Sequence, residues 1–183
     1  MNYGTIKKFD VANGEGIRTT LFVSGCRNRC KNCFQPETWS FSYGKPFDRA
    51  AMEEIYESMR IPSVKGLTLL GGEPMEPENQ EGLLPFLREF KSLFPEKNIW
   101  LFTGNLYEEL TAGVGNHPKS LPITPEILSM VDILVDGRFV EEKKQLGLRF
   151  RGSSNQRIID MNKTRAAGEI VIWEGVKLDK HYK

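Results

Sequence analysis

Short apolar runs alternate with amphipathic stretches along most of the chain. The runs are rich in β-branched and aliphatic residues and end at turn residues, which is typical of buried strands; they span residues 18–24, 66–70, 98–102 and 131–135, with 157–161 and 169–172 as candidates for two more. Apolar residues at helical spacing predict helices over residues 48–59, 79–94 and 106–112, and a further helix capped by Thr124 with Pro125 at its first position. Because strands alternate with helices, we expect an α/β domain with a mainly parallel sheet.

Four polar or glycine-containing segments each follow one of the predicted strands. They are the loop 25–44, Gly71-Gly72-Glu73-Pro74, Thr103-Gly104 and Asp136-Gly137. Parallel α/β folds bind ligands at the carboxyl ends of their strands. We therefore expect these segments to meet on one rim and form a single active site. Arg18, at the start of the first strand, is expected either to pair with an acidic residue near this site or to be an exposed charge.

Length and charge exclude several classes of function. A chain of 183 residues suits one domain with a sizeable core. The formal net charge of +1 gives no reason to expect nucleic acid or an anionic membrane as a partner. No apolar run is long enough to span a bilayer, and residues 1–10 lack the apolar core of a signal peptide. We therefore expect a cytoplasmic protein.

All 3 cysteines, Cys26, Cys30 and Cys33, lie in the loop 25–44, which we call the cysteine loop. Their C-x3-C-x2-C spacing indicates metal or redox chemistry rather than a disulfide framework. An ordinary [4Fe–4S] cluster takes four thiolates, so three would leave one iron open to a substrate. Zinc is the main alternative: His117 and His181 lack ligand spacing to the cysteines, although a carboxylate would complete a zinc site.

A C-x3-C-x2-C array after one strand, followed by GGEP after the next, resembles the radical SAM superfamily. The resemblance is closer to one family within it, the activating proteins of the anaerobic (class III) ribonucleotide reductases. The segments that carry it are residues 13–18 (NGEGIR), 21–26 (LFVSGC), Cys33-Phe34, Thr38-Trp39, 131–139 (VDILVDGRF) and 150–160 (FRGSSNQRIID). The last segment is the most telling, because general radical SAM motifs do not include it.

The resemblance implies a function. In this family S-adenosylmethionine (SAM) binds the open iron of a [4Fe–4S] cluster, and reductive cleavage gives methionine and a 5′-deoxyadenosyl radical. That radical removes a hydrogen from a glycine of the large subunit of the reductase, which leaves a glycyl radical there. The cluster and SAM supply the chemistry, so no catalytic residue beyond them is expected. A flavodoxin-like protein would donate the electron.

The resemblance also implies an architecture, the incomplete (open) radical SAM (βα) barrel. A complete eight-unit barrel typically needs about 250 residues, so an open one fits this length better. The whole chain, residues 1–183, would form a single radical SAM domain. Residues 162–183 extend past the resemblance and are expected to be a closing strand or a partner contact.

Site residues follow from the matching motif positions. Cys26, Cys30 and Cys33 would hold the cluster. The backbone of Gly71 and Gly72 and the carboxylate of Glu73 would meet the cationic amino group of SAM. The polar residues on the expected rim would bind the ribose or the methionyl carboxylate of SAM, or dock the partner; they are Thr103, Asp136, Arg138, Asn155, Gln156 and Arg157.

Two positions depart from the family pattern. Asn32 stands where the superfamily often has an aromatic residue that packs on adenine, so the adenine contact would come from the main chain of Asn32 and the region of Cys33 and Phe34. Glu15 stands where relatives commonly have proline. The neighbouring glycines still permit a tight turn there, so we expect altered stiffness rather than loss of function.

Two other functions remain open from the residues. The first is an activase for another glycyl radical enzyme, or a small radical SAM enzyme that acts on a free metabolite. Many activases carry an added eight-cysteine ferredoxin insert, which a chain with 3 cysteines cannot hold. The second is a non-catalytic zinc or iron–sulfur module that docks a partner.

Overall fold

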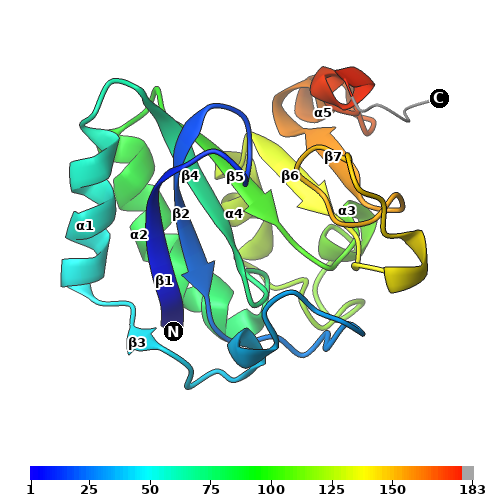
Figure 1. Cartoon of the computed structure of the whole chain (residues 1–183), viewed down its shortest axis with the longest axis horizontal. Coiled ribbons are helices and arrows are strands. Elements are labelled where there is room, and N and C mark those ends of the chain that lie inside the picture. The colour runs from blue at the N-terminus through cyan, green and yellow to red at the C-terminus, as the bar shows by residue number, and fades with distance from the viewer. Residues whose placement is uncertain (179–183) are drawn as a thin grey trace.

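The computed structural model describes residues 1–178, in which strands and helices alternate through most of the chain (Figure 1). Asp48 caps a helix as expected, because its side chain accepts a hydrogen bond from Ala51 N at 3.0 Å. The helices and strands are β1 (Asn2–Asp10), β2 (Ile17–Val23), β3 (Lys45–Pro46), α1 (Arg49–Met59), β4 (Val64–Gly71), α2 (Pro77–Leu93), β5 (Asn98–Phe102), α3 (Tyr107–Leu110), α4 (Thr124–Met130), β6 (Ile133–Asp136), β7 (Arg157–Asp160) and α5 (Met161–Ala167).

The strands of the described residues form a seven-stranded sheet in the order β3-β1-β2-β4-β5-β6-β7. The central strands β2, β4, β5 and β6 run parallel to one another. At the edges, β1 is antiparallel to β2 and β3, and β7 is antiparallel to β6. The mixed α/β class is therefore confirmed, and the expectation of parallel strands holds for the centre of the sheet.

The two faces of the sheet are covered differently. Helices α1, α2 and α4 pack on one face, where Ile55 and Phe90 belong to the main apolar core (Figure 1). On the other face Trp100 packs with Phe150 and Trp173, which come from loops rather than from helices. Within residues 1–178, no helix combines the length and the apolar character needed to cross a membrane.

Two predictions at the ends of elements are wrong. Thr124 is the first residue of α4 rather than its cap, because its hydroxyl donates a hydrogen bond to Gln80 Oε1 at 2.6 Å instead of accepting one from the turn that follows. Residues 169–172 do not form a strand. Ile172 makes an isolated bridge to Ile159, and the N–H of Val171 donates to a side chain, Thr164 Oγ1, instead of to the sheet.

Strand β1 has no counterpart among the predicted strands. Most of its nine residues are exposed or half-buried, and only Asp10 is buried. An edge position lets polar side chains face water along the strand, so the apolar run that marks a central strand is missing. The pairing with β2 nevertheless fixes β1 beside the start of the cysteine loop, since Ser24 N donates to Asn2 O at 2.9 Å.

Candidate functional site

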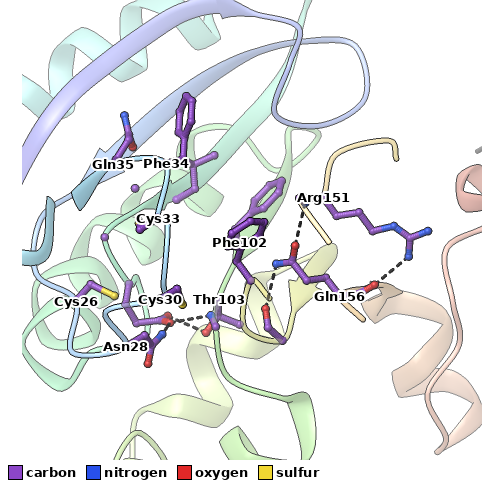
Figure 2. Close-up of a pocket in the computed structure, with 18 of the residues that line it drawn as sticks. Cys26, Asn28, Cys30, Cys33, Phe34, Gln35, Phe102, Thr103, Arg151 and Gln156 are labelled. Atoms are coloured by element: carbon purple, nitrogen blue, oxygen red, sulfur yellow. Dashed lines mark hydrogen bonds between the residues drawn. The ribbon is translucent and has the colours of Figure 1, made fainter. Parts of the chain in front are cut away.

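A cavity of about 550 Å³ opens at the carboxyl ends of the central strands (Figure 2). This volume lies in the range of sites for small molecules and cofactors. The expected meeting of the four segments is confirmed, because each of them contributes to the wall. The lining residues include Cys26, Asn28, Cys30, Asn32, Cys33, Phe34, Gly71, Gly72, Glu73, Phe102, Thr103, Gly104, Gly137, Phe150, Arg151 and Gln156.

The three cysteines line this cavity as free thiols. Cys26 is buried, whereas Cys30 and Cys33 are half-buried. Burial, assisted by the nearby Glu73 carboxylate, raises the pKa of Cys26 to about 11, and burial also raises the pKa of Cys30. Metal ions bind the thiolate form, so ligation at this site would release protons.

The donor set fits an iron–sulfur cluster. Thiolates are the ligands that such clusters use, and all three thiols belong to one cavity wall. Among residues 1–178, no three His, Cys, Asp or Glu side chains are gathered closely enough to hold a metal ion. His117 lines a different cavity, and His181 lies outside the described residues. A zinc site completed by histidine therefore finds no support in residues 1–178.

Glu73 links three of the segments that form the cavity wall. Its side chain belongs to a residue that is only 1% exposed, and its Oε1 accepts hydrogen bonds from Met75 N at 3.0 Å and Thr103 Oγ1 at 2.7 Å. Its Oε2 accepts from Gly104 N and from Asn28 Nδ2, both at 2.8 Å. One carboxylate thus joins the GGEP loop to the end of β5 and to the cysteine loop.

The two glycines before Glu73 are required by close backbone packing. Gly71 has φ +109°, in the left-handed region that favours glycine. A Cβ on Gly72 would lie 2.6 Å from the carbonyl oxygen of Gly25, which is too close for any side chain. The absence of side chains lets the end of β4 pack directly against the base of the cysteine loop, where Glu73 N donates to Gly25 O at 2.9 Å.

The cysteine loop has two arms that are held differently; the first arm comprises residues 26–28. Glu76, only 1% exposed, accepts hydrogen bonds from Arg27 N and Arg27 Nη1, both at 2.8 Å. Lys119, 7% exposed, lies 3.0 Å from Glu76 Oε1 and donates to Asn28 Oδ1 at 3.0 Å. Because the partners are buried and charged, these bonds fix the first arm strongly.

The second arm, residues 29–34, has fewer contacts. Arg29 and Asn32 have φ +45° and +56°, which non-glycine residues adopt at some cost in strain. Lys31 pairs with Glu142 at 3.3 Å, but both side chains are well exposed. Phe34 is 91% exposed, and its ring points away from Cys26 and Cys30 (Figure 2). The second arm is therefore free to adjust around a ligand.

Asp136 and Arg157, predicted on the rim, are engaged with each other. They are cross-strand partners in β6 and β7, and Arg157 Nε donates to Asp136 Oδ1 at 2.9 Å. Arg157 also donates to both carboxylate oxygens of Glu108 in α3, at 2.9 and 2.6 Å, and this bond lowers the pKa of Glu108 to about 2. Neither Asp136 nor Arg157 lines the cavity.

Arg138 and Asn155 do not line this cavity either, and Arg138 instead lines a second cavity together with His117 and Lys119. Asn155 Nδ2 donates to Arg138 O at 2.8 Å, and Arg138 Nη2 reaches Asn28 Oδ1 at 3.4 Å. Thr103, in contrast, lines the main cavity and donates to Glu73. Of the polar rim residues, the structure thus places Thr103 and Gln156 in the wall of the main cavity, and a ligand contact by any of them stays a prediction.

Gln156, predicted on the rim, lines the cavity and holds the segment 150–160 in place, since its Oε1 accepts from Gly152 N at 2.9 Å and its Nε2 donates to Gly137 O at 3.0 Å. Asn28 and Phe150 also line the cavity but were not predicted as site residues. The position of Asn28 between two of the cysteines was the available signal. Phe150 packs edge-on against Trp100, with ring centroids 5.3 Å apart, a contact between distant segments.

Arg18 fits neither of the two expectations for it. The side chain is fully buried, yet it contacts no carboxylate. Its guanidinium donates to neutral oxygens, namely Thr68 Oγ1 at 2.7 Å, Leu67 O at 2.7 Å and Asn98 Oδ1 at 2.8 Å. Burial lowers its pKa to about 10. Arg18 therefore cross-links β2, β4 and β5 beneath the cavity.

Comparison with known proteins agrees with this geometry. Residues 12–159 match the family model of a 4Fe-4S single cluster domain. Proteins of Pasteurella multocida and Haemophilus influenzae, both named anaerobic ribonucleoside-triphosphate reductase-activating protein, are 40% and 41% identical over 158 residues, which is 85% of this chain and 95% and 96% of theirs. The protein of that name from Enterobacteria phage T4 is 36% identical over 86% of this chain and 93% of its own. The chain belongs to the family of anaerobic ribonucleoside-triphosphate reductase-activating proteins.

Proposed function

We propose that this chain activates an anaerobic ribonucleoside-triphosphate reductase by a radical SAM reaction. The observation that carries the proposal is the shared cavity, in which the three cysteines face the GGEP loop and the end of β5. The names of the relatives supply the partner. When bound, a reduced [4Fe–4S] cluster and SAM supply a one-electron cleavage that forms a 5′-deoxyadenosyl radical, and this radical takes hydrogen from a glycine of the large subunit of the reductase.

The roles of the lining residues follow from their chemistry. Cys26, Cys30 and Cys33 hold the cluster through thiolates and leave one iron without a protein ligand. Glu73, whose carboxylate is buried, accepts a hydrogen bond from the amino group of SAM, and the backbone of Gly71 and Gly72 lies beside it. Within the wall, the Thr103 hydroxyl orients the carboxylate of Glu73.

The second arm of the cysteine loop lies next to the position proposed for adenine. Asn32, Cys33 and Phe34 all line the cavity. Phe34 is exposed and has room to turn its ring onto a bound base. The other rim residues support the cavity indirectly. Asp136 and Arg157 join β6 to β7, and Asn155 and Arg138 support the loop that follows β6.

We propose that residues 1–183 form one radical SAM domain with an open barrel. Two features support it. The central strands are parallel, and the face of the sheet opposite the helices carries the aromatic cluster of Trp100, Phe150 and Trp173. Trp173 N donates to Ile158 O at 2.8 Å, so the described part of the C-terminal segment covers this face instead of extending away from it. The open side of the barrel would admit a glycine loop of the reductase.

Electron supply and location complete the proposal. A flavodoxin-like protein delivers the electron to the cluster. Free thiols at the proposed ligand positions and an iron–sulfur cluster are both favoured by reducing surroundings. The reaction therefore takes place in the cytoplasm.

Anaerobic reconstitution tests the proposal. Iron and sulfide should each approach four per chain, and dithionite should then drive the release of 5′-deoxyadenosine from SAM. Tight binding of one zinc ion with no cleavage of SAM would contradict the proposal and favour a docking module. Cleavage of SAM without radical transfer to the reductase would point instead to another glycyl radical enzyme or to a free metabolite as the substrate.

A further inference from the structure

Every acceptor position of the Glu73 carboxylate is occupied by a donor of the protein itself. A carboxylate offers about four lone-pair sites, two on each oxygen. Met75 N and Thr103 Oγ1 donate to Oε1, and Gly104 N and Asn28 Nδ2 donate to Oε2. A ligand amino group that donates to Glu73 must therefore share or replace one of these four hydrogen bonds.

Three of the four donors are fixed. Met75 N and Gly104 N are backbone groups, and Thr103 Oγ1 is held by Asn105, whose N and Nδ2 donate to it at 3.1 and 2.8 Å. Asn28 is the donor that comes from the cysteine loop. A Cβ on Gly104 would lie 2.3 Å from Asn28 Nδ2, so the glycine at that position provides the space that Asn28 occupies beside Oε2.

Charged groups set the orientation of the Asn28 amide. Its Oδ1 faces Lys119 Nζ at 3.0 Å and Arg138 Nη2 at 3.4 Å, while its Nδ2 faces the Glu73 carboxylate at 2.8 Å. Lys119 is itself well anchored, since its carbonyl oxygen accepts from Gln80 Nε2 at 2.8 Å and its Nζ lies 3.0 Å from Glu76. Lys119 therefore holds Asn28 against Glu73.

We propose that Asn28 is a placeholder for the ligand amino group: its amide N–H occupies the site on Glu73 Oε2 that an N–H of the amino group of SAM takes on binding. The amide is the donor that gives way because its side chain can turn, whereas the other three donors are backbone groups or, like Thr103 Oγ1, are held by Asn105. Before the ligand arrives, Asn28 keeps the buried carboxylate satisfied. The inference rests on the proposed function in taking SAM as the ligand of Glu73.

The placeholder also connects the ligand to the cysteine loop. Asn28 is two residues from Cys26 and two from Cys30, so release of its Nδ2 from Glu73 loosens this side chain between two of the proposed cluster ligands, while Arg27 keeps the first arm on Glu76. Asn28 is thus a positioning residue that exchanges partners when the cavity fills. Lys119 retains Glu76 as a partner throughout.

Binding measurements on the cluster-loaded protein test the placeholder without turnover. Calorimetry under anaerobic conditions would measure the Kd of SAM and of 5′-methylthioadenosine, which lacks the amino group. In Asn28→Ala the Kd of SAM should fall about 5-fold, because SAM no longer has to break a hydrogen bond of ordinary strength. The Kd of 5′-methylthioadenosine should not change. An unchanged or higher Kd of SAM, or equal tightening of both ligands, would overturn the proposal.

A second variant substitutes no residue of the cysteine loop itself. Lys119→Met removes the cation that holds Asn28, so the Kd of SAM should fall about 2-fold, and this variant decides the question if Asn28→Ala does not retain iron. An unchanged or higher Kd of SAM in Lys119→Met would then contradict the placeholder. Lys97→Met is the matched control, because Lys97 is 8% exposed and donates to Val64 O at 2.7 Å, outside the lining of the cavity. Its Kd should equal that of the wild type.

Failure of the proposed function and failure of the placeholder would give different results. If the wild-type protein binds SAM but never cleaves it, the radical reaction is excluded, while the difference between SAM and 5′-methylthioadenosine still decides the role of Asn28. If Glu73→Gln leaves the Kd of SAM unchanged, Glu73 does not bind the amino group and the placeholder is contradicted, although SAM cleavage can still be observed.

Discussion

The two arms of the cysteine loop contrast in how the protein holds them. The first arm carries a buried cysteine, Cys26, and is anchored through Arg27 and Asn28 to the buried residues Glu76 and Lys119. The second arm carries the two half-buried cysteines, backbone in the left-handed region and an exposed aromatic ring. One part of the proposed cluster site is therefore preformed, and the other is free to close around its ligand.

The difference between the two arms explains why the three thiols line one cavity without being gathered for a metal ion. Among residues 1–178, no three ligand-type side chains are gathered for a metal ion, although all three thiols share one cavity. We expect cluster binding to bring Cys30 and Cys33 toward Cys26, because the second arm can move with little loss of protein contacts. We expect ligation to shift the second arm and to leave the first arm in place.

The largest expected effect comes from the cysteines themselves. Cys30→Ala leaves two thiolates, so cluster binding and SAM cleavage should both be lost, as measured by iron content and by release of 5′-deoxyadenosine. Ser24→Ala is a suitable control in the same region, because Ser24 is buried and its Oγ has no hydrogen-bond partner within residues 1–178. Full activity in Cys30→Ala would refute its assignment as a ligand.

Removal of the anchor of the first arm should have the next largest effect. Glu76→Gln takes the anion away from Arg27 and from the buried Lys119, which should cost about 3–5 kcal/mol in the free energy of unfolding. Urea denaturation of the protein without its cluster measures this. A loss below about 1 kcal/mol, the size expected for a surface ion pair, would show that the first arm is not anchored in this way.

Arg157→Ala should have a smaller effect, on stability rather than on the cavity. Asp136, which is fully buried, would lose its cationic partner, at a cost of about 2 kcal/mol. Iron content and the Kd of SAM should remain close to the wild-type values, because Arg157 does not line the cavity. Loss of SAM binding at unchanged stability would show instead that Arg157 contacts the ligand.

The ion pair between Arg157 and Glu108 predicts that stability depends on pH. In the folded protein the hydrogen bond from Arg157 depresses the pKa of Glu108 to about 2, below its ordinary value of 4.5. The stabilisation is therefore complete above the unfolded pKa and is lost as the pH falls toward 2. Glu108 is exposed, so the effect is modest and is screened by salt. The stability difference between wild type and Arg157→Ala should narrow between pH 5 and pH 2; a constant difference would contradict this origin.

The smallest expected effect belongs to the second arm. Lys31 and Glu142 are 75% and 68% exposed, and Lys31→Ala should change the free energy of unfolding by less than about 0.5 kcal/mol. Comparison with Glu76→Gln measures the contrast between the arms directly. Equal losses in the two variants would show that both arms are equally anchored.

Local sequence patterns were sufficient for much of the fold. The apolar runs at 18–24, 66–70 and 98–102 correspond to the central strands β2, β4 and β5. The edge strand β1 escaped prediction because its side chains are mostly exposed or half-buried. The candidate strand at 169–172 failed because its backbone bonds to a side chain, Thr164, which no local pattern reveals.

The site shows the same limit more sharply. The cysteines and GGEP follow strands that are neighbours in the sheet, so their meeting was predictable from strand order. Asn28 and Lys119 are 91 positions apart in the chain, and their contact depends on how the loop before α4 folds back. Asp136 and Arg157 were placed correctly at strand ends, but their register as cross-strand partners, which turns them toward each other, requires the structure.

The most direct test of the proposed function is the transfer of the radical to the reductase. The reconstituted and reduced protein would be mixed anaerobically with SAM and the large subunit of its anaerobic ribonucleoside-triphosphate reductase, and the mixture examined by EPR. If the proposed function is right, a glycyl radical forms on the reductase, requires SAM and is absent with Cys30→Ala. Cleavage of SAM in the presence of the reductase, with no glycyl radical on it, would rule out the activation of this reductase.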